Sequence, residues 1–414
     1  MVRVFFKISV LIFFILFLLS GQVAYAQMEE RLFTTDYQID SLQKGQLSIE
    51  MDNLSFYKNN EYGSTIQKGY TLPGFWLQLK AVYYPLTNLK LEVGAHSTWF
   101  WGTTRYPAIA YKNSIPTLNG KDYYNIVHVL PYFRANLALS NNVSVVLGDI
   151  YGGANHRLID PLFNPELNLS TDPEKGVQLL YKTKWLDFDM WLDWTSFIYN
   201  RDTIQESFVA GGSARIKLNS PASRFHVYLP VQGLAYHKGG ELDITDTNIQ
   251  TIMNGAFGAG LRWNVKGRVI EYVNAEAYMT GYVFPKGGTS YFDRGRGYYS
   301  KIAVQLKDFN INTSYWSSGN FFSVFGNAFY STISTKLDDM IYYNPKMLNF
   351  NVDYSRVLGK GFAFGVKAEA YYYVSGKMYS LKTGAFEPSP FGKNANFSVG
   401  VYLRLNPSFL IKQF

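Results

Sequence analysis

Short segments in which apolar and polar residues alternate run along most of the chain from residue 45 onward. Between Leu186 and Trp194 every second residue is apolar, and Asp187, Asp189 and Asp193 stand among the intervening positions. Successive side chains of a strand point to opposite faces, so this period of two predicts strands with one apolar and one polar face. No stretch with the 3.6-residue period of a helix competes with it. One face suits lipid, and the other suits water.

The connections between the alternating segments are short and long in turn. About sixteen segments start near residues 46, 74, 89, 123, 143, 174, 186, 206, 224, 251, 268, 298, 310, 347, 362 and 395. Turns such as 85–88 and 140–142 are tight, whereas 151–173 and 318–346 are long and polar. Outer-membrane barrels have short periplasmic turns and long external loops, and an open sheet would leave unsatisfied edges in lipid. The predicted fold class is therefore all-β: a single antiparallel transmembrane β-barrel of about 16 (roughly 14 to 18) strands.

The first 26 residues have the pattern of a secretory signal peptide. Arg3 and Lys7 precede the apolar stretch 8–19, and Ala24-Tyr25-Ala26 forms a small-x-small cleavage site. An uncleaved anchor is the alternative, but a membrane span needs about 20 apolar residues. We expect export to the bacterial outer membrane, with cleavage near Ala26. The predicted organisation is a signal peptide over 1–26, a periplasmic N-terminal segment over 27–44, the barrel over 45–405 and a C-terminal extension over 406–414.

Composition narrows the candidate chemistry. The 414 residues include no cysteine, which excludes disulfides, zinc–thiolate sites and thiol catalysis. The 33 Tyr and 31 Phe gather at segment ends, as in 99–101 and 371–373, which indicates two aromatic girdles at the membrane interfaces. The net charge is +8, but the basic residues alternate with apolar ones instead of clustering. We therefore expect no nucleic-acid partner.

The end of the chain resembles the insertion signal of Gram-negative outer-membrane barrels. Ser398, Gly400, Leu403 and Leu405 stand at the polar, glycine and alternating apolar positions of that signal. The resemblance implies recognition by the barrel-assembly machinery. The chain departs from the pattern because 406–414 follows the signal, which leaves the end of the last strand open.

The chain as a whole, over roughly 45–405, resembles the porin type of outer-membrane barrel. That resemblance implies contact with outer-membrane lipid and lipopolysaccharide, and a homotrimer. The tyrosine-rich character and the stretches 173–178 and 191–194 are similar to uncharacterised barrels of Bacteroidota. This narrower resemblance carries no substrate.

If the apolar faces contact lipid, the charged residues of the other faces line the lumen. The predicted pore-lining residues are Lys80, Arg134, Asp187, Asp189, Asp193, Arg215, Lys217, Arg262, Glu276, Lys301, Lys367 and Arg404. Basic residues outnumber acidic ones in this set, so the wall should favour anions. Alternatively, the charges pair with one another and only solvate the wall. The same face assignment predicts that Leu192→Arg is costly and that a change at inward Asp189 is tolerated.

The long loop 151–173 is a candidate for narrowing the channel. Its residues His156, Arg157 and Asp160 could form a constriction with Arg134 of the wall, because long loops are usually functional or disordered. Alternatively, they are external contacts with lipopolysaccharide or with neighbouring loops.

A search for catalytic groups finds little support in the sequence. The chain has no GxSxG, HExxH or phosphate-loop motif. His96 and Ser97 are neighbours on a strand and point to opposite faces, so they cannot pair. His128 and His226 lie on inward faces and could reach a carboxylate across the lumen. We predict no catalytic residue, no metal and no cofactor, and hence a protein that is not an enzyme.

The predicted function is a porin-like channel for passive diffusion of small hydrophilic solutes, with a preference for anions. The alternative is a closed or plugged barrel with a structural, adhesive or assembly role. The two differ in whether 151–173 or 318–346 leaves the lumen open.

Overall fold

The computed structural model describes residues 28–414, except 102–127, 221, 241, 246–247, 266, 268, 286–291, 360 and 389–394. The predicted signal peptide and its cleavage site lie outside the described residues. Within this part of the chain, no helix is both long enough and apolar enough to cross a membrane.

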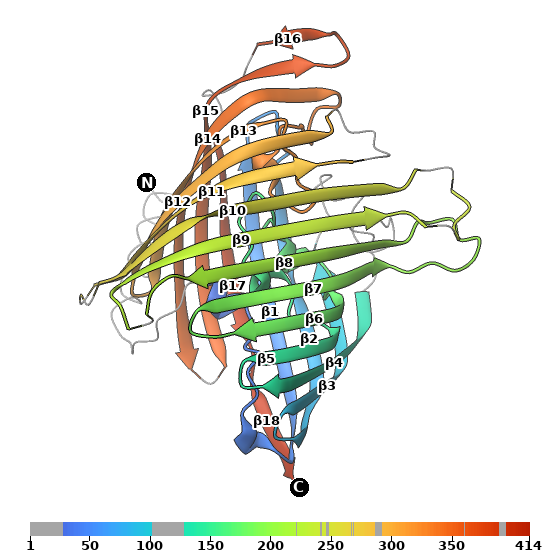
Figure 1. The fold of residues 1–414 in the computed structure, drawn as a ribbon, viewed down its shortest axis with the longest axis vertical. Helices are drawn as coiled ribbons and strands as arrows, with labels where there is room; N and C mark the ends of the chain where they lie inside the picture. Colours follow the sequence, from blue (N-terminus) through green and yellow to red (C-terminus); the bar gives the residue numbers. More distant parts are fainter. Residues whose placement is uncertain are drawn as a thin grey trace, which may run out of the picture.

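Sixteen antiparallel strands form a closed barrel (Figure 1). They are β1 (Gln46–Tyr62), β2 (Tyr70–Leu86), β3 (Leu89–Phe100), β4 (His128–Ser140), β5 (Val143–Asp149), β6 (Lys175–Lys182), β7 (Leu186–Ser196), β8 (Ser207–Lys217), β9 (Phe225–Lys238), β10 (Gln250–Asn264), β11 (Ile270–Val283), β12 (Arg294–Leu306), β13 (Phe309–Gly319), β14 (Met340–Gly359), β15 (Phe362–Ser380) and β17 (Asn396–Leu405). Strand β17 pairs with β15 on one side and with β1 on the other, which closes the sheet. The prediction of an all-β barrel of about 16 strands is confirmed.

Two further strands extend the barrel at its ends. Strand β16 (Ala385–Glu387) pairs with β15 in the connection that leads to β17. Strand β18 (Ser408–Gln413) follows Pro407 and pairs with the first residues of β1. The C-terminal extension, whose structure the sequence left open, is therefore a strand. The short helices are α2 (Met28–Leu32), η1 (Ser41–Gln43), η4 (Gly153–His156), α3 (Leu167–Ser170) and η5 (Ala328–Tyr330).

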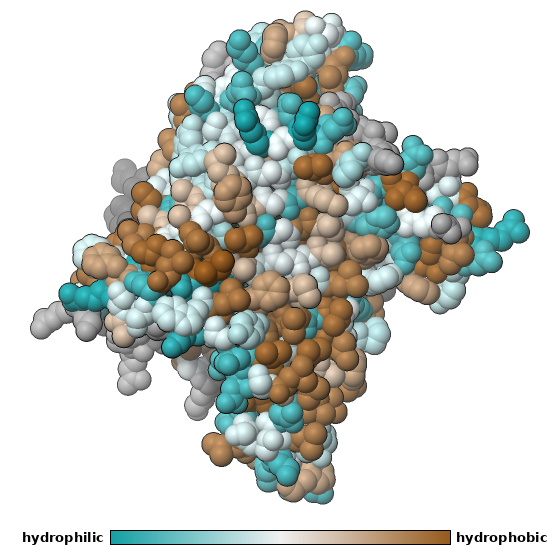
Figure 2. All heavy atoms as spheres, viewed as in Figure 1, coloured by the Kyte–Doolittle hydropathy of each residue, from teal (hydrophilic) through white to brown (hydrophobic). Residues whose placement is uncertain are grey.

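The alternation along each strand separates an apolar outside from a polar inside. On β2, Leu79 is 53% exposed on the outer face, whereas Lys80 beside it is only 6% exposed on the inner face. Figure 2 shows apolar side chains gathered in broad patches over the strands. Every strand of a closed barrel has two hydrogen-bonded neighbours, so its backbone groups are satisfied in lipid. The fold is that of an outer-membrane protein.

Strand β7 offers a direct test of the two faces. Leu192 lies on the outer face, between the exposed side chains of Met190 and Trp194. We expect Leu192→Arg to lower the free energy of unfolding by about 2–4 kcal/mol, because an arginine near the bilayer midplane loses hydration. Urea titration of the protein refolded into vesicles measures this difference. A change within about 0.5 kcal/mol, as at ordinary surface positions, would contradict the assignment.

Two long loops enter the barrel and meet inside it. They are loop 150–174, between β5 and β6, and loop 320–339, between β13 and β14. The backbone N–H of Asn164 donates to the carbonyl of Phe325 at 2.8 Å, and that of Asn327 donates to the carbonyl of Asp160 at 3.1 Å. The loops bring Leu162, Leu167, Phe321 and Phe329, all at most 1% exposed, into one apolar core. This core lies toward the extracellular end of the barrel, where the long loops are.

The N-terminal segment also packs inside the barrel. Helix α2 contacts β14, β15 and β17, and its Leu32 is fully buried. Gly365 allows this approach, because a Cβ at that position would lie 2.4 Å from Leu32 Cδ1. Arg404 Nη1 donates to the carbonyls of Leu32 (3.1 Å) and Thr34 (2.7 Å). The first described residues of the predicted periplasmic segment over 27–44 thus lie against the inner wall, because an apolar helix face gains by burial there.

Candidate active site

Most of the predicted pore-lining charges are paired inside the barrel. Lys217 Nζ lies 2.7 Å from Asp187, and Arg404 Nη2 lies 2.8 Å from Asp52. Lys367 Nζ lies 2.8 Å from Glu369, while Arg215, Arg262, Glu276, Lys301 and Lys367 line one polar cavity. Many of these charges are therefore paired with one another. This is the arrangement that the sequence analysis gave as the alternative to an anion-selective wall.

Glu92 is the centre of the largest charge cluster. Its carboxylate is fully buried and lies 2.8 Å from Lys80 Nζ, 2.7 Å from Lys90 Nζ and 3.3 Å from Arg134 Nη1. These residues come from β2, β3 and β4, whose register brings them to one level of the inner wall. The cluster neutralises Lys80 and Arg134, which the sequence assigned to an open pore.

The residues predicted to form a constriction do not form one cluster, although Arg157 and Asp160 line the same polar cavity. Arg134 donates to the carbonyls of Asp149 and Ile150 at the start of loop 150–174. Arg157 lies 4.0 Å from Asp187, and Asp160 accepts a hydrogen bond from Tyr299 at 3.3 Å. Each residue therefore attaches the loop to a different part of the wall.

The predicted insertion-signal residues lie on β17. Ser398 and Gly400 face the inside, and Ser398 Oγ donates to Glu369 at 3.1 Å. A Cβ at position 400 would lie 2.1 Å from the Tyr402 hydroxyl, so glycine makes room for that ring. Leu403 and Leu405 belong to the outward face of the same strand.

His156 fastens loop 150–174 to strand β7. Its Nδ1 lies 2.7 Å from Asp189 and its Nε2 lies 2.9 Å from Glu174, and its ring stacks on Trp191 at 3.5 Å. Burial alone would lower the pKa of His156, but the two carboxylates outweigh it and raise this pKa to about 10. The ring is therefore a cation at pH 7 and cannot serve as a base. The expectation that a change at Asp189 is tolerated is corrected, because Asp189 is buried against this imidazolium.

The attachment of loop 150–174 should depend on pH. Because the folded-state pKa of His156 is raised above its ordinary value of 6.5, the stabilisation is complete below about pH 6.5 and is lost as the pH rises through about 10. We expect proteinase K to cut the loop slowly at pH 7 and faster near pH 10, after normalisation to its rate on unfolded protein. In the His156→Gln variant, proteinase K should cut the loop fast at both pH values. Equal rates for the wild-type protein across this range would contradict the assignment.

An apolar cavity of about 230 Å³ lies between loop 150–174 and the inner wall. Its apolar lining includes Leu130, Leu158, Phe163, Leu167, Trp191, Val209, Leu234 and Phe325. Thr171, Asp172, Lys175 and Asp193 add polar groups to this lining. A cavity that is mostly apolar, with a few convergent polar groups, is the usual form of a small-molecule site.

A histidine–carboxylate pair stands beside this cavity. His128 Nε2 lies 3.1 Å from Asp172 Oδ1, and the two side chains are 21% and 14% exposed. His128 is the first residue of β4, so it lies at the extracellular end of the barrel, and Leu130 two positions later lines the cavity. A carboxylate that orients an imidazole makes it a general base for water or a hydroxyl. Hydrolysis of a substrate with an apolar chain is chemistry that this arrangement can perform.

Over residues 39–414 the chain matches the Lipid A 3'-O-deacylase-type family. The protein belongs to this family. No curated protein matches the chain.

Several solved outer-membrane proteins are similar to this Lipid A 3'-O-deacylase-type chain in their barrel fold only. OccAB3 of Acinetobacter baumannii is 12% identical, with a TM-score of 0.45 over 88% of this chain and 99% of that chain. The BenF-like porin of Pseudomonas fluorescens Pf-5 is 8% identical, with a TM-score of 0.48 over 88% of this chain and 100% of that chain. OmpT of Vibrio cholerae is also 8% identical, with a TM-score of 0.46 over 87% of this chain and 99% of that chain.

The prediction that the protein is not an enzyme is wrong, because membership of a Lipid A 3'-O-deacylase-type family points to an enzymatic activity. The candidate catalytic residues form no sequence motif because they are far apart in the chain. His128 was recognised as an inward histidine, but its partner Asp172 comes 44 residues later, on a loop whose path the alternation does not predict. The signal available in the sequence was the run of apolar residues in that loop, including Leu158, Leu162 and Leu167, which is unusual for an external loop.

Proposed function

We propose that this protein hydrolyses an ester-linked acyl chain of lipid A at the extracellular end of its barrel. The family supports the substrate class, and the site supports the reaction type. The observation that carries the proposal is the His128–Asp172 pair beside the apolar cavity, at the end of the barrel that belongs to the outer leaflet.

The proposed reaction needs a base, an acid and a stabiliser of negative charge. His128 takes a proton from a water molecule as the water oxygen attacks the ester carbonyl carbon. Asp172 holds the ring and stabilises the imidazolium that forms. The tetrahedral intermediate collapses, the bond to the sugar oxygen breaks, and His128 returns the proton to that oxygen. Lys175, which lines the cavity, supplies a positive charge near the developing oxyanion.

The apolar cavity would hold the acyl chain during this reaction. Phe163, Leu167 and Leu234 give this cavity a lining that is mostly apolar. Each methylene that enters such a lining contributes about 0.8 kcal/mol. The cavity would therefore select acyl esters over short esters.

The test is direct hydrolysis by the refolded protein. Purified lipid A in mixed detergent micelles is incubated with the protein, and mass spectrometry follows the loss of one acyl chain and the release of the matching fatty acid. We expect both products in equal amounts. Lipid A that stays intact with correctly folded protein would contradict the proposal.

A second function, passive diffusion of small hydrophilic solutes with a preference for anions, is favoured by a different observation. The barrel contains a charge-lined cavity of about 470 Å³ toward its periplasmic end. Passage through the whole barrel would require loops 150–174 and 320–339 to separate. Planar-bilayer recording in a salt gradient tests this function. Stable conductance steps, with a reversal potential whose sign shows anion selectivity, would support it. A correctly folded barrel that gives no conductance would contradict it.

A further inference from the structure

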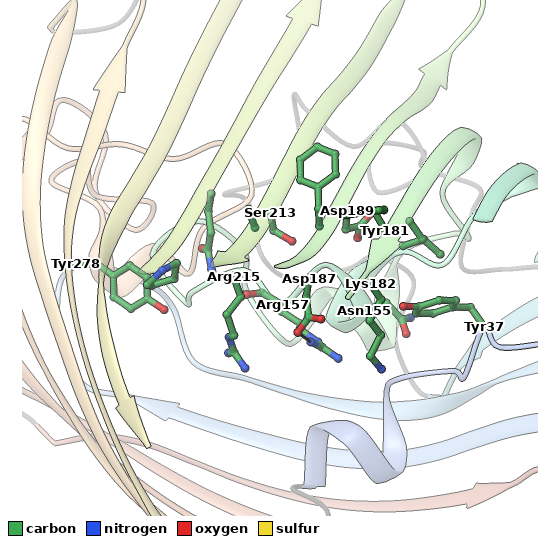
Figure 3. Close-up of a pocket in the computed structure, with 15 residues that line it drawn as sticks. Tyr37, Asn155, Arg157, Tyr181, Lys182, Asp187, Asp189, Ser213, Arg215 and Tyr278 are labelled. Carbon is green, nitrogen blue, oxygen red and sulfur yellow. Dashed lines mark hydrogen bonds and ion pairs between the residues drawn. The ribbon is translucent and has the colours of Figure 1, made fainter. Parts of the chain in front are cut away.

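The polar cavity of about 470 Å³ is a second site, distinct from the apolar cavity. It lies between the N-terminal segment, loop 150–174 and the inner wall of β8 to β15. The two cavities share only the lining residue Leu158. Figure 3 shows the adjoining pocket, where Arg157, Asp187 and Arg215 project into the same space above the N-terminal helix. The strand ends around this cavity are those joined by short turns, so it belongs to the periplasmic half.

A ladder of amide side chains crosses one wall of this cavity. Asn312 Nδ2 donates to Asn310 Oδ1 at 2.9 Å, and Asn351 Nδ2 donates to Asn312 Oδ1 at 2.9 Å. Asn351 Oδ1 at the end of this ladder and Asp353 Oδ1, two residues further along β14, have no hydrogen-bond partner in the described part of the protein, although both residues are at least nine-tenths buried. Buried acceptors without donors are costly, so this wall is suited to a ligand that supplies hydroxyl groups.

Two cations face the same space, and in the described part of the protein no carboxylate lies within ion-pair distance of either. Lys301 of β12 makes no hydrogen bond or ion pair with any described residue, and it lines the cavity. The Arg262 guanidinium lies 3.7 Å over the ring of Tyr272, and its Nε donates to Asn264 at 3.1 Å. No described carboxylate comes within ion-pair distance of Arg262. These two groups are available to an anionic ligand.

Two of the acidic residues that line the cavity, Glu276 and Asp160, are hydrogen-bonded to groups of the wall. Glu276 accepts a hydrogen bond from Tyr228 at 2.6 Å and lies 3.9 Å from Arg215. Asp160 accepts from Tyr299. Glu276 stands opposite Lys301 in the register of β11 and β12, and Glu29 and Asp160 also act on its charge. None of these three carboxylates comes within ion-pair distance of the Lys301 ammonium, so a ligand anion can approach it.

We propose that this cavity binds a small polyhydroxylated anion, a sugar that carries a carboxylate or a phosphate. Lys301 and Arg262 pair with the anionic group, and the hydroxyls donate to Asn351 and Asp353. The Tyr272 and Tyr278 rings offer faces for the sugar ring. The site faces the periplasmic side and does not depend on the hydrolytic function proposed above.

The test measures binding to the full-length protein refolded in detergent micelles. Isothermal titration calorimetry is run with sodium galacturonate, with glucose 6-phosphate and with neutral galactose as probes. We expect saturable binding of at least one anionic sugar and roughly tenfold weaker or undetectable binding of galactose. The two anionic probes distinguish the carboxylate from the phosphate. Lys301→Gln should weaken binding roughly ten- to hundredfold, because a charged hydrogen bond is lost.

A matched lysine outside the cavity serves as the control. Lys382 lies on an exposed turn between β15 and β16, so Lys382→Gln should leave the affinity unchanged. Asn351→Ala tests the hydroxyl-binding wall without changing the charge, and it should weaken the binding of both anionic sugars. The proposal is overturned if neither anionic sugar binds, if galactose binds equally well, or if Lys301→Gln in a barrel of normal heat-modifiable gel mobility binds like the wild type.

Discussion

Replacing His128 with asparagine is expected to lower the rate of lipid A deacylation by roughly 10²–10⁴-fold, the usual contribution of a general base. Asparagine keeps a polar side chain of similar size next to Asp172 but cannot accept a proton from water. Asp172→Asn should lower the rate in the same direction, because the ring loses the carboxylate that orients it and stabilises its charged form. Initial rates of fatty acid release, measured by mass spectrometry, provide the comparison.

A matched control for this prediction is present in the chain. His226 also points inward, but it lies near the periplasmic end of β9, opposite Arg262 of β10. His226→Asn should therefore leave the deacylation rate unchanged. If His128→Asn retained the wild-type rate while the wild-type protein hydrolysed lipid A, the assignment of the base would be wrong and the function would stand.

Replacing Glu92 with glutamine is expected to lower the free energy of unfolding by about 3–5 kcal/mol, the cost of breaking a buried charge pair. The carboxylate neutralises Lys80, Lys90 and Arg134, which are each less than 9% exposed. Glutamine would leave three buried cations without their common anion, and these cations would also repel one another. Urea titration of the protein refolded into vesicles measures the difference.

Glu50 is the matched control for Glu92. It lies 4.0 Å from Lys80, but its side chain is 25% exposed, whereas the side chain of Glu92 is fully buried. Glu50→Gln should change the free energy of unfolding by at most about 1 kcal/mol, as for other exposed pairs. If both variants lost the same free energy of unfolding, burial would not explain how much this cluster stabilises the barrel.

The interior of the barrel has two regions with different chemistry. Toward the extracellular end, the loops bring Leu162, Phe321 and Phe329 into a packed apolar core beside the candidate active site. Toward the periplasmic end, Lys301 and the asparagine ladder border a polar cavity. A folded loop core can hold the His128–Asp172 pair in position while strands supply a rigid frame.

The alternation of apolar and polar residues was enough to predict the barrel. Alternation along the chain predicts both the strands and their faces, because a strand's side-chain period is two whatever its partners are. The alternation of short and long connections predicts which strand ends face the periplasm. The predicted strand starts near residues 46, 89, 143, 186 and 362 match those of β1, β3, β5, β7 and β15 closely.

The contents of the barrel depend on contacts between loops and strands that are far apart in the chain. A loop has no period that reveals its path, so neither the meeting of loops 150–174 and 320–339 nor the pairing of His128 with Asp172 could be read from spacing. The same holds for His156, which is a cation between Glu174 and Asp189 only because two parts of loop 150–174 meet β7 there. The face of a strand on which a side chain lies follows from local backbone geometry. The residues that this side chain contacts inside the barrel depend on how the whole chain folds.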